Sequence, residues 1–435
     1  MRVLMFGWEF PPHISGGLGT ACYGLTRGMA SIPDLDVTFV VPKAFGDEDQ
    51  SKIQIIGANN ISLKYKKLSY NSFRKEIEYI EVDSMLVPYV DPEEFWRLKS
   101  NEVSSSWRYL QTDIDGKLYF TGKYGKDLLQ EISNYAIVAN VIAQEHDFEI
   151  IHAHDWLTYP AGIAAKQASG KPLVIHVHAT DFDRSGGSVN PVVYDIEKQG
   201  MDAADRIITV SNLTRNIVIE KYNIDPAKVV TVYNAVDPLK EQKFADSKSV
   251  DEKIVTFLGR ITMQKGPEYF IEAAHRVLQR MDNVRFVMAG SGDMMEKMIR
   301  RAAQLKIMDK FHFTGFLKGD DVFNMLGMSD LYVMPSVSEP FGISPLEAMQ
   351  SNVPVLISHQ SGVAEILTYA IKTNFWDIDA MADAIYGVLN YPSLSATFKK
   401  YGKHEVDQLK WENSAHRVKD VYTSVLQQIN NTHQK

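Results

Sequence analysis

The sequence contains one cysteine, Cys22, among 435 residues. A single cysteine excludes an internal disulfide framework and is typical of a protein from a reducing compartment. No apolar run reaches the length of about 18 residues that would predict a membrane-spanning helix. The N-terminal MRVLMFGWEF lacks the apolar core and the small-residue cleavage site of a secretory signal peptide. We therefore expect a cytoplasmic protein.

The sequence also lacks an excess of positive charge, because its net charge is −8. Broad electrostatic attraction to nucleic acid or to anionic lipid is therefore not expected. One basic run, KYKK at residues 64–67, could touch a membrane surface. The run is short and has polar flanks, so we favour a solvated face over peripheral membrane contact. No base accompanies Cys22 in the sequence, and we expect this residue to pack in a helix rather than to act as a nucleophile.

Short β-rich runs alternate with helical patterns along almost the whole chain. This alternation predicts parallel sheets built from βαβ units. In the first half the predicted strands are RVLMF, VTFVVP, EIIHAH, PLVIHVH, RIITVS and KVVTVYN. In the second half they are KIVTFLG, VRFVMAG, KFHFTG, DLYVMP and PVLIS. The sequence therefore predicts an α/β protein with two tandem doubly wound, Rossmann-like domains that face each other across a cleft.

The domain boundaries follow from breaks in this rhythm. Residues 1–236 form the predicted N-terminal domain, with a Tyr- and Trp-rich irregular insertion at 51–125. The charged, aperiodic segment 237–253 is the predicted linker. Residues 254–405 form the predicted C-terminal domain, and 406–435 contain an amphipathic helix.

A glycine-rich loop, PPHISGGLGT, follows the first predicted strand and precedes a helix. Its glycines, Gly16, Gly17 and Gly19, would let backbone N–H groups approach an anion at the helix N-terminus. The loop does not fit the G-x-G-x-x-G dinucleotide fingerprint, because the third glycine position falls on Cys22. A phosphate site and a plain structural turn both remain open at this loop.

The second half repeats this arrangement with charge added. In FLGRITMQKG, Arg260 and Lys265 lie between a strand and a helix that Pro267 opens. A guanidinium and an ammonium beside a helix N-terminus suit a diphosphate. Taken singly, such residues are more often solvated surface cations, but the carboxyl end of a parallel strand is where ligands bind.

Two carboxylates flank a turn in PSVSEPFGISPLEAM. Glu339 lies where a proline and a glycine fix the end of a strand, and its carboxylate can accept hydrogen bonds from sugar hydroxyls. Glu347 has two interpretations. Ser344 as N-cap, Pro345 at the first helical position and Glu347 would form a capping box, or Glu347 could bind a ligand such as a ribose.

Two H-x-H pairs occur in HAHDW and HVHATDFD. This spacing on a strand places both imidazoles of a pair on one face, which would suit a metal site of the amidohydrolase kind. Because the strands lie inside a doubly wound pattern and no further ligand cluster has matching spacing, we favour core or hydrogen-bonding histidines. The Asp181 and Asp183 pair is too common a pattern to indicate a metal.

Taken together, these residues resemble the retaining nucleotide-sugar glycosyltransferases of the GT-B fold. That group contains glycogen, starch and sucrose synthases and many bacterial polysaccharide transferases of families four and five. The resemblance spans nearly the whole chain and lies in GGLGT, HAHDW, HVHATDFD, YNAVD, GRITMQKG, AGSGD and EPFGISPLE. The opening MFGWEFPPHISGGLGTACYGL and the HDW element are similar to the glycogen-synthase side of the group.

The resemblance implies a role for each matching residue. Arg260 and Lys265 would neutralise the departing diphosphate, and His178 would lie near the anomeric centre. The catalytic residues implied are Glu339, Lys265, Arg260, His178 and Asp155, the last on the acceptor side. The donor-binding residues implied are Gly16, Gly17, Asn234, Arg260, Lys265, Glu339, Phe341, Gly342, Ile343 and Glu347. No metal and no other cofactor is expected, and the C-terminal helix would cross back to brace the first domain.

The sequence departs from the group at three places. Bacterial glycogen synthases carry a lysine before the first glycine pair, where this chain has Ser15. A glycine pair expected after the seventh strand reads HQSGVAEIL, with Ser361 in the first position. The segment KTNFWDID lacks expected glycines, so base recognition is not predicted.

The predicted function is retaining transfer of a hexose, with glucose expected, from a UDP- or ADP-sugar to an α-glucan. The alternative within the same chemistry is an acceptor that is a lipid-linked or surface-polysaccharide precursor. Two alternatives from other classes are a metal-dependent hydrolase that uses the H-x-H pairs and a non-catalytic carbohydrate-binding protein.

Overall fold

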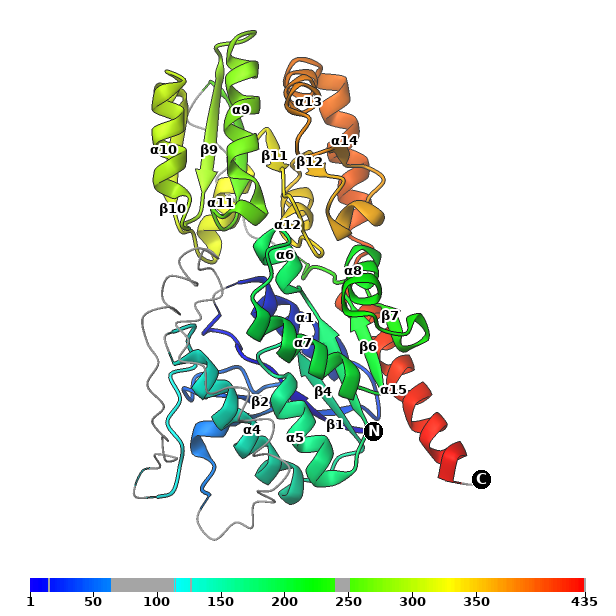
Figure 1. The fold of residues 1–435 in the computed structure, drawn as a ribbon. Helices are drawn as coiled ribbons and strands as arrows, with labels where there is room; N and C mark the ends of the chain where they lie inside the picture. Colours follow the sequence, from blue (N-terminus) through cyan, green and yellow to red (C-terminus); the bar gives the residue numbers. More distant parts are fainter. Residues whose placement is uncertain (15, 64–112, 114, 126, 239–250, 434–435) are drawn as a thin grey trace. The chain divides into compact units, whose positions relative to one another are not determined.

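The structure is a computed structural model that describes residues 1–433 apart from 15, 64–112, 114, 126 and 239–250 (Figure 1). Most of the predicted insertion, the basic run at 64–67 and most of the predicted linker lie outside the described residues. The chain divides into two compact units. The first contains Met1–Asn234 and Trp411–Lys435, and the second contains Ala235–Lys410.

The first unit is built on a seven-stranded parallel sheet with the strand order β3-β2-β1-β4-β5-β6-β7. Its strands are β1 (Arg2–Phe6), β2 (Asp36–Val41), β3 (Gln54–Gly57), β4 (Ile150–His154), β5 (Leu173–Val177), β6 (Arg206–Thr209) and β7 (Val229–Thr231). The central strands are buried on both faces, as expected where helices cover both sides of a parallel sheet.

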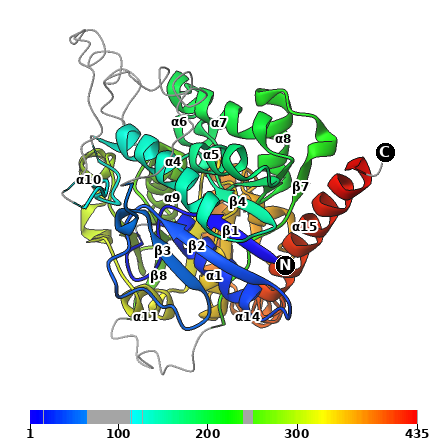
Figure 2. The same cartoon turned by 90° about the horizontal axis from the view of Figure 1, so that it is seen from below.

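Helices cover both faces of this sheet. They are α1 (Gly17–Ala30), α4 (Leu128–Glu145), α5 (Tyr159–Ser169), α6 (Asp181–Ser185), α7 (Pro191–Ala203), α8 (Asn212–Tyr222) and α15 (Trp411–His433), with 3₁₀ turns at Ala58–Asn60 and Pro226–Lys228. α4 packs on α5 and α5 on α7, whereas α1 packs on α15. Figure 2 shows α4, α5 and α7 on one side of β1, β2 and β4 and α1 on the other.

The second unit contains a six-stranded parallel sheet with the order β10-β9-β8-β11-β12-β13. Its strands are β8 (Lys253–Leu258), β9 (Val284–Ala289), β10 (Phe311–Gly315), β11 (Leu331–Met334), β12 (Val355–Ser358) and β13 (Ile371–Thr373). Its helices are α9 (Pro267–Leu278), α10 (Met295–Gln304), α11 (Asp320–Met328), α12 (Ser344–Gln350), α13 (Ile378–Asn390) and α14 (Pro392–Val406), with 3₁₀ turns at Met263–Lys265, Met308–Lys310 and Gly362–Glu365.

Alternate side chains of β8 serve the two faces of this sheet. Val255 and Phe257 join the larger core, formed with α9, α10 and α13. Ile254 packs in a smaller cluster that contains Met325 of α11. The period-two pattern read from the sequence therefore becomes two separate apolar layers, one on each side of the strands.

The predicted fold class, two parallel-sheet α/β domains, is confirmed. Two short strands differ from the prediction. β3 lies within the segment 51–125 that the sequence analysis treats as an irregular insertion, and β13 was not predicted at all. Both are edge strands of four and three residues, too short for a periodic pattern to be recognised.

The C-terminal helix α15 belongs to the first unit and packs on α1. Two glycines of α1 make the close approach possible. A Cβ built on Gly24 would lie 2.1 Å from Trp411 Cε2, and one on Gly28 would lie 2.6 Å from Trp411 O. The segment predicted as 406–435 begins with the last residue of α14, and the helix itself starts at Trp411.

Candidate active site

An ion pair joins two loops at the carboxyl ends of β8 and β11. Lys265 Nζ lies 2.5 Å from Glu339 Oε2, and Ser336 Oγ donates a 3.3 Å hydrogen bond to the same oxygen. The Glu339 side chain is only 9% exposed and that of Lys265 21% exposed. Two residues that the sequence analysis placed in one site therefore do meet within the second unit.

Three backbone hydrogen bonds hold the loops that carry this pair. Val337 N donates to Gln264 O at 2.9 Å, which joins the Glu339 loop to the Lys265 loop. Glu339 N donates to Gln360 O, and Gly362 N donates to Glu339 O, each at 2.9 Å. Lys265 and Glu339 are therefore anchored at the backbone as well as through their side chains.

Ser361, which stands where the resemblance noted in the sequence would place a glycine, fits this turn without strain. Its φ of −135° is extended backbone that any residue can adopt. The hydroxyl of Ser361 donates a 2.6 Å hydrogen bond to Ser358 O. The departure read from the sequence therefore leaves the geometry around Glu339 intact.

Three glycines allow the loops of the second unit to pack closely. Gly266 has a φ of 66°, and a Cβ there would lie 2.1 Å from Pro335 O. Gly290 and Gly292 of the AGSGD segment would bring a Cβ within 1.8 Å of Gly259 O and 2.3 Å of Ile261 O. The AGSGD glycines therefore make room for the loop that carries the half-buried Arg260.

The turn between Glu339 and α12 contains the predicted donor residues Phe341, Gly342 and Ile343. Gly342 has a φ of 101°, a conformation that favours glycine. Phe341 is buried, and its carbonyl accepts a 2.8 Å hydrogen bond from Val363 N. Ile343 is half-buried and caps α12.

The predicted capping box at Ser344 and Glu347 is wrong. The N-cap of α12 is Ile343 in a helical conformation, and no side chain caps the helix. Ser344 is already the first helical residue, so its hydroxyl is not in the position of a cap. Among the described residues no hydrogen bond reaches the half-buried Glu347 carboxylate, and burial raises its pKa to about 7.

In the first unit, Gly16 and Gly17 mark the start of α1. Gly16 is the N-cap with a φ of −174°, and no side chain caps the first turn. A Cβ added at either glycine would meet nothing within 4 Å, whereas one at Gly19 would lie 2.4 Å from Ile14. Open space therefore surrounds the start of α1, and packing requires glycine only at Gly19.

The two imidazoles of each H-x-H pair share a face of the first sheet, as predicted, and the structure also brings the two pairs together. His152 and His154 come from β4, His176 from β5, and His178 follows β5; the ring centroids of His154 and His176 are 5.2 Å apart. His178 Nε2 lies 2.9 Å from His154 Nδ1, and His152 Nδ1 lies 2.5 Å from the Tyr422 hydroxyl of α15. Burial lowers the pKa of all four imidazoles, that of His178 to about 3, so the cluster is neutral.

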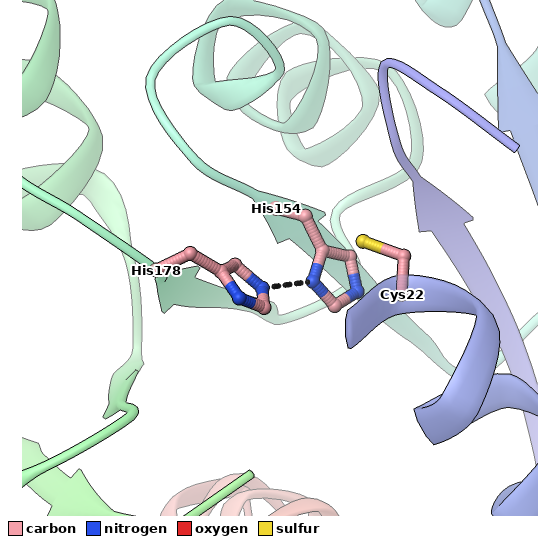
Figure 3. A group of neighbouring side chains, drawn as sticks. All are labelled: Cys22, His154 and His178. Carbon is pink, nitrogen blue, oxygen red and sulfur yellow. Dashed lines mark hydrogen bonds between the residues drawn. The ribbon is translucent and has the colours of Figure 1, made fainter. Parts of the chain in front are cut away.

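Figure 3 shows Cys22 of α1 beside His154 and His178, with the hydrogen bond between the two rings. The potential ligand atoms of these three residues lie within 4.8 Å of one another. The Cys22 thiol is fully buried and its pKa is raised, chiefly by that burial, which disfavours the thiolate that binds metal.

A second histidine set, His152, His154 and His176, has similarly close ring nitrogens. The His152 and His176 rings are nearly parallel, at 7°. Since a ring nitrogen binds a metal in the plane of its ring, two parallel stacked rings do not converge on one ion. The arrangement suits a stack of neutral imidazoles better than a hydrolytic metal centre.

Asp155 and Asn234 both lie in the first unit. Asp155 follows β4 with a φ of 62°, and its carboxylate accepts hydrogen bonds from His178 N at 2.7 Å and Ala179 N at 3.3 Å. Burial raises its pKa to about 6 against the opposing effect of Arg184. Asn234 is buried at the end of this unit. The Asp155 carboxylate is therefore directed at the backbone around His178.

A second buried charge cluster lies beside Asp155 and was not predicted from the sequence. It contains Arg184 of α6 and Glu197 of α7, which form an ion pair at 3.1 Å. Asp183, half of the D-x-D pair, accepts hydrogen bonds from the Thr180 N–H and hydroxyl and so caps α6. The sequence signal for this cluster is the arginine that directly follows the HVHATDFD run.

In the part of the chain that the structure describes, no helix is long and apolar enough to cross a membrane.

The comparisons with known proteins agree with this fold. Residues 239–405 match the family described as Glycosyl transferases group 1, and residues 113–239 match Glycosyltransferase Family 4. The chain belongs to the GT-B glycosyltransferases. Within that class it is of the kind grouped in families four and five, as the sequence resemblance predicted.

Three relatives illustrate this similarity. An uncharacterised glycosyltransferase of Methanocaldococcus jannaschii is 27% identical and aligns over 99% of this chain and 100% of its own length. The glycogen synthase of Mycobacterium tuberculosis is 23% identical over 97% of this chain and 94% of its own. An Escherichia coli galactosyltransferase that acts on a GlcNAc-diphosphoundecaprenol is 26% identical over 69% of this chain and 80% of its own length.

One solved structure shows the shared fold over nearly the whole length. The Anabaena protein HepE, in complex with UDP and glucose, superimposes with a TM-score of 0.68 at 15% identity. The match covers 98% of this chain and 100% of HepE.

Proposed function

We propose that this glycosyltransferase moves a hexose, glucose in the first instance, from a nucleoside-diphosphate sugar to an α-glucan with retention of the anomeric configuration. The observation that carries the proposal is the Lys265–Glu339 pair, which lies in the loops beyond β8 and β11. Arg260 lies in the first of these loops, and Glu347 lies in the first turn of α12, which follows the second. The full-length likeness to a glycogen synthase supports the acceptor class, and the UDP and glucose bound to HepE support the donor class.

The second unit holds the donor in this proposal. Arg260 and Lys265 neutralise the diphosphate, where negative charge develops as the bond to the sugar breaks. Glu339 accepts hydrogen bonds from hydroxyls of the transferred sugar, and Glu347, which lacks a protein hydrogen-bond partner among the described residues, accepts those of the ribose. The backbone of Phe341, Gly342 and Ile343 lines the same turn.

The first unit supplies the acceptor side and the remaining donor contacts. Gly16 and Gly17 present backbone N–H groups at the start of α1 to the donor phosphate. The neutral His178 imidazole faces the anomeric centre, Asn234 contacts the sugar, and Asp155 holds the His178 backbone.

Retention follows from attack on the face that the leaving group occupies. The anomeric carbon–oxygen bond to the diphosphate breaks, and the acceptor hydroxyl oxygen bonds to the same face of that carbon. The hydroxyl proton passes to the departing phosphate oxygen, so the products are the extended saccharide and a protonated nucleoside diphosphate. No metal takes part in this scheme, because two cations and backbone N–H groups stabilise the leaving group.

A second acceptor class has support from one comparison. The Escherichia coli relative acts on a diphosphoundecaprenol-linked sugar, and it aligns over 69% of this chain. The chemistry at the donor would be the same, and only the acceptor would change to a lipid-linked precursor.

The test is release of nucleoside diphosphate from UDP-glucose, ADP-glucose and GDP-mannose, each with glycogen, with a polyprenyl-diphosphate sugar, and without acceptor. We expect glycogen-dependent release from one glucose donor, unaffected by a chelator, and an α-linked product by NMR. Glu339→Ala should abolish this release while the protein stays folded. Release that requires the lipid acceptor would replace the first proposal with the second, and absence of transfer with every donor would contradict both.

A further inference from the structure

We propose that Arg184 and Glu197 are positioning residues for glycosyl transfer, acting through Asp155 to fix the backbone at His178. The inference rests on the proposed function, which places His178 beside the anomeric carbon. Neither residue touches substrate in this account. Both act by holding the segment that follows β5 in one conformation.

The first of three linked contacts is between the Asp155 carboxylate and the backbone. β5 ends at Val177, and the next two N–H groups, of His178 and Ala179, both donate to Asp155 Oδ1. Asp155 N in turn donates to His176 O at 2.9 Å. One carboxylate therefore defines how the chain leaves the sheet at the point where His178 begins.

Arg184 holds that carboxylate and the same segment from α6. Its Nη2 lies 3.4 Å from Asp155 Oδ2 and donates a 3.1 Å hydrogen bond to Ala179 O. The Arg184 side chain is 10% exposed and that of Asp155 is 6% exposed. A guanidinium can reach both partners because its donors are fixed in one plane, which a lysine ammonium cannot reproduce.

Glu197, held by Tyr222, makes the last of these contacts, on the side of Arg184 opposite Asp155. Glu197 Oε1 accepts from Arg184 Nη1 at 3.1 Å, while Oε2 accepts from Asp181 N at 3.2 Å and from the Tyr222 hydroxyl. Glu197 is 1% exposed, and burial raises its pKa to about 8. The arrangement orients the Arg184 guanidinium between two carboxyl groups on α7 and after β4.

Stability alone is a poor explanation for this cluster. Buried ion pairs contribute little net stability, because desolvation offsets the attraction between the charges. The cluster also lies at the carboxyl ends of β4 and β5, the end of a parallel sheet where ligands bind. Asp155 additionally adopts a positive φ, which is uncommon for a residue other than glycine.

The test compares three variants by turnover and donor KM. Arg184→Met removes the charge and the contacts with Asp155, Ala179 and Glu197, and we expect kcat to fall by about 10²-fold. Donor KM should stay within about twofold, because the proposed donor groups of the second unit are untouched. Arg184→Lys should recover part of the loss, and Glu197→Gln, which retains volume but replaces an acceptor with a donor, should lower kcat by about tenfold.

The matched control is Lys166→Met. Lys166 forms a 2.8 Å ion pair with Asp205, and Asp205 Oδ2 also accepts from Leu173 N, at the opposite end of the β5 strand from His178. We expect this variant to alter thermal stability without changing kcat. Hydrogen exchange of the peptide that contains the His178 and Ala179 amides should quicken in Arg184→Met and stay unchanged in the control.

Several outcomes would overturn the proposal. One is a folded Arg184→Met protein with kcat within about threefold of the wild type. Another is a loss of activity that only tracks the loss of stability, as in Lys166→Met. If Arg184→Met does not fold, Glu197→Gln decides the question, and if neither folds the cluster is structural. Unchanged hydrogen exchange would also contradict the proposal, and that readout remains valid if no donor is turned over and the proposed function fails.

Discussion

Lys265 Nζ and Glu339 Oε2 lie 2.5 Å apart, although the two residues are 74 positions apart in the sequence. Each comes from a loop beyond a central strand of the second sheet, and hydrogen bonds between the loops hold both backbones. The pair therefore presents an ammonium group and a carboxylate side by side before any donor binds. Such preorganisation is what electrostatic stabilisation of a leaving group requires.

Replacing Lys265 tests its role in neutralising the diphosphate. We expect Lys265→Ala to lower kcat by about 10²–10³-fold, as loss of one electrostatic contact to the developing charge does. Stability should fall by only about 1–3 kcal/mol, because Glu339 loses its cation but retains Ser336. Lys297→Ala, which removes the exposed 3.0 Å pair with Glu268, is the control and should leave turnover unchanged. A Lys265→Ala rate equal to that of the control would remove Lys265 from the site.

Glu347 predicts a pH dependence of donor binding. Its pKa of about 7 means that the carboxylate ionises as the pH rises through neutrality, so donor KM should fall between pH 6 and pH 8. Glu347→Gln should raise KM at pH 8 by about tenfold and flatten the profile. Because the folded pKa is raised above the unfolded one, the stability that the protonated group contributes is lost as pH rises through 7. The free energy of unfolding of Glu347→Gln should lack this pH dependence. Equal KM values for variant and wild type at pH 8 would eliminate the ribose contact.

The buried histidines predict a loss of stability in acid. Burial keeps the folded-state pKa of His176 well below its ordinary value of 6.5, and among the described residues neither of its ring nitrogens has a hydrogen-bond partner. In the unfolded chain His176 takes up a proton below pH 6.5. The contribution of the neutral His176 to the free energy of unfolding is therefore fully present above pH 6.5. It is lost at about 1.4 kcal/mol per pH unit as the pH falls below that value.

The measurement is urea denaturation of His176→Leu at pH 7.5, 6 and 5. The variant should unfold with a shallower pH dependence than the wild type, and the exposed His416→Leu should not. Parallel curves for His176→Leu and the wild type would show that His176 takes up its proton without unfolding.

The contact between Gly24 and Trp411 predicts how α15 is held on α1. A methyl group at Gly24 would overlap the indole, so Gly24→Ala should destabilise the first unit by about 1–3 kcal/mol. Gly387→Ala in α13 is the matched control, since a Cβ there meets only Leu394 at 4.0 Å and alanine favours a helix. Thermal melts of the two variants should therefore shift in opposite directions. Equal shifts would mean that α15 does not depend on this contact.

The sequence predicted the sheets, and it placed the candidate residues Lys265 and Glu339 at strand ends, because both features leave local patterns. Buried parallel strands appear as apolar runs, and loops such as GRITMQKG carry their charges at strand ends. The capping box at Ser344 failed because α12 begins one residue earlier than expected, with Ile343 at the N-cap and Ser344 already in the helix. Arg184 and Glu197 could not be predicted, since their pairing depends on α6 and α7 folding against each other, and single charged residues leave no periodic signal.

The central claim is that the loops after β8 and β11 hold the diphosphate of the donor. A crystal of the protein soaked with UDP tests it most directly. The account predicts density for the two phosphates within hydrogen-bonding distance of Arg260 and Lys265, with the ribose hydroxyls at Glu347. Phosphate density bound away from both cations would contradict it.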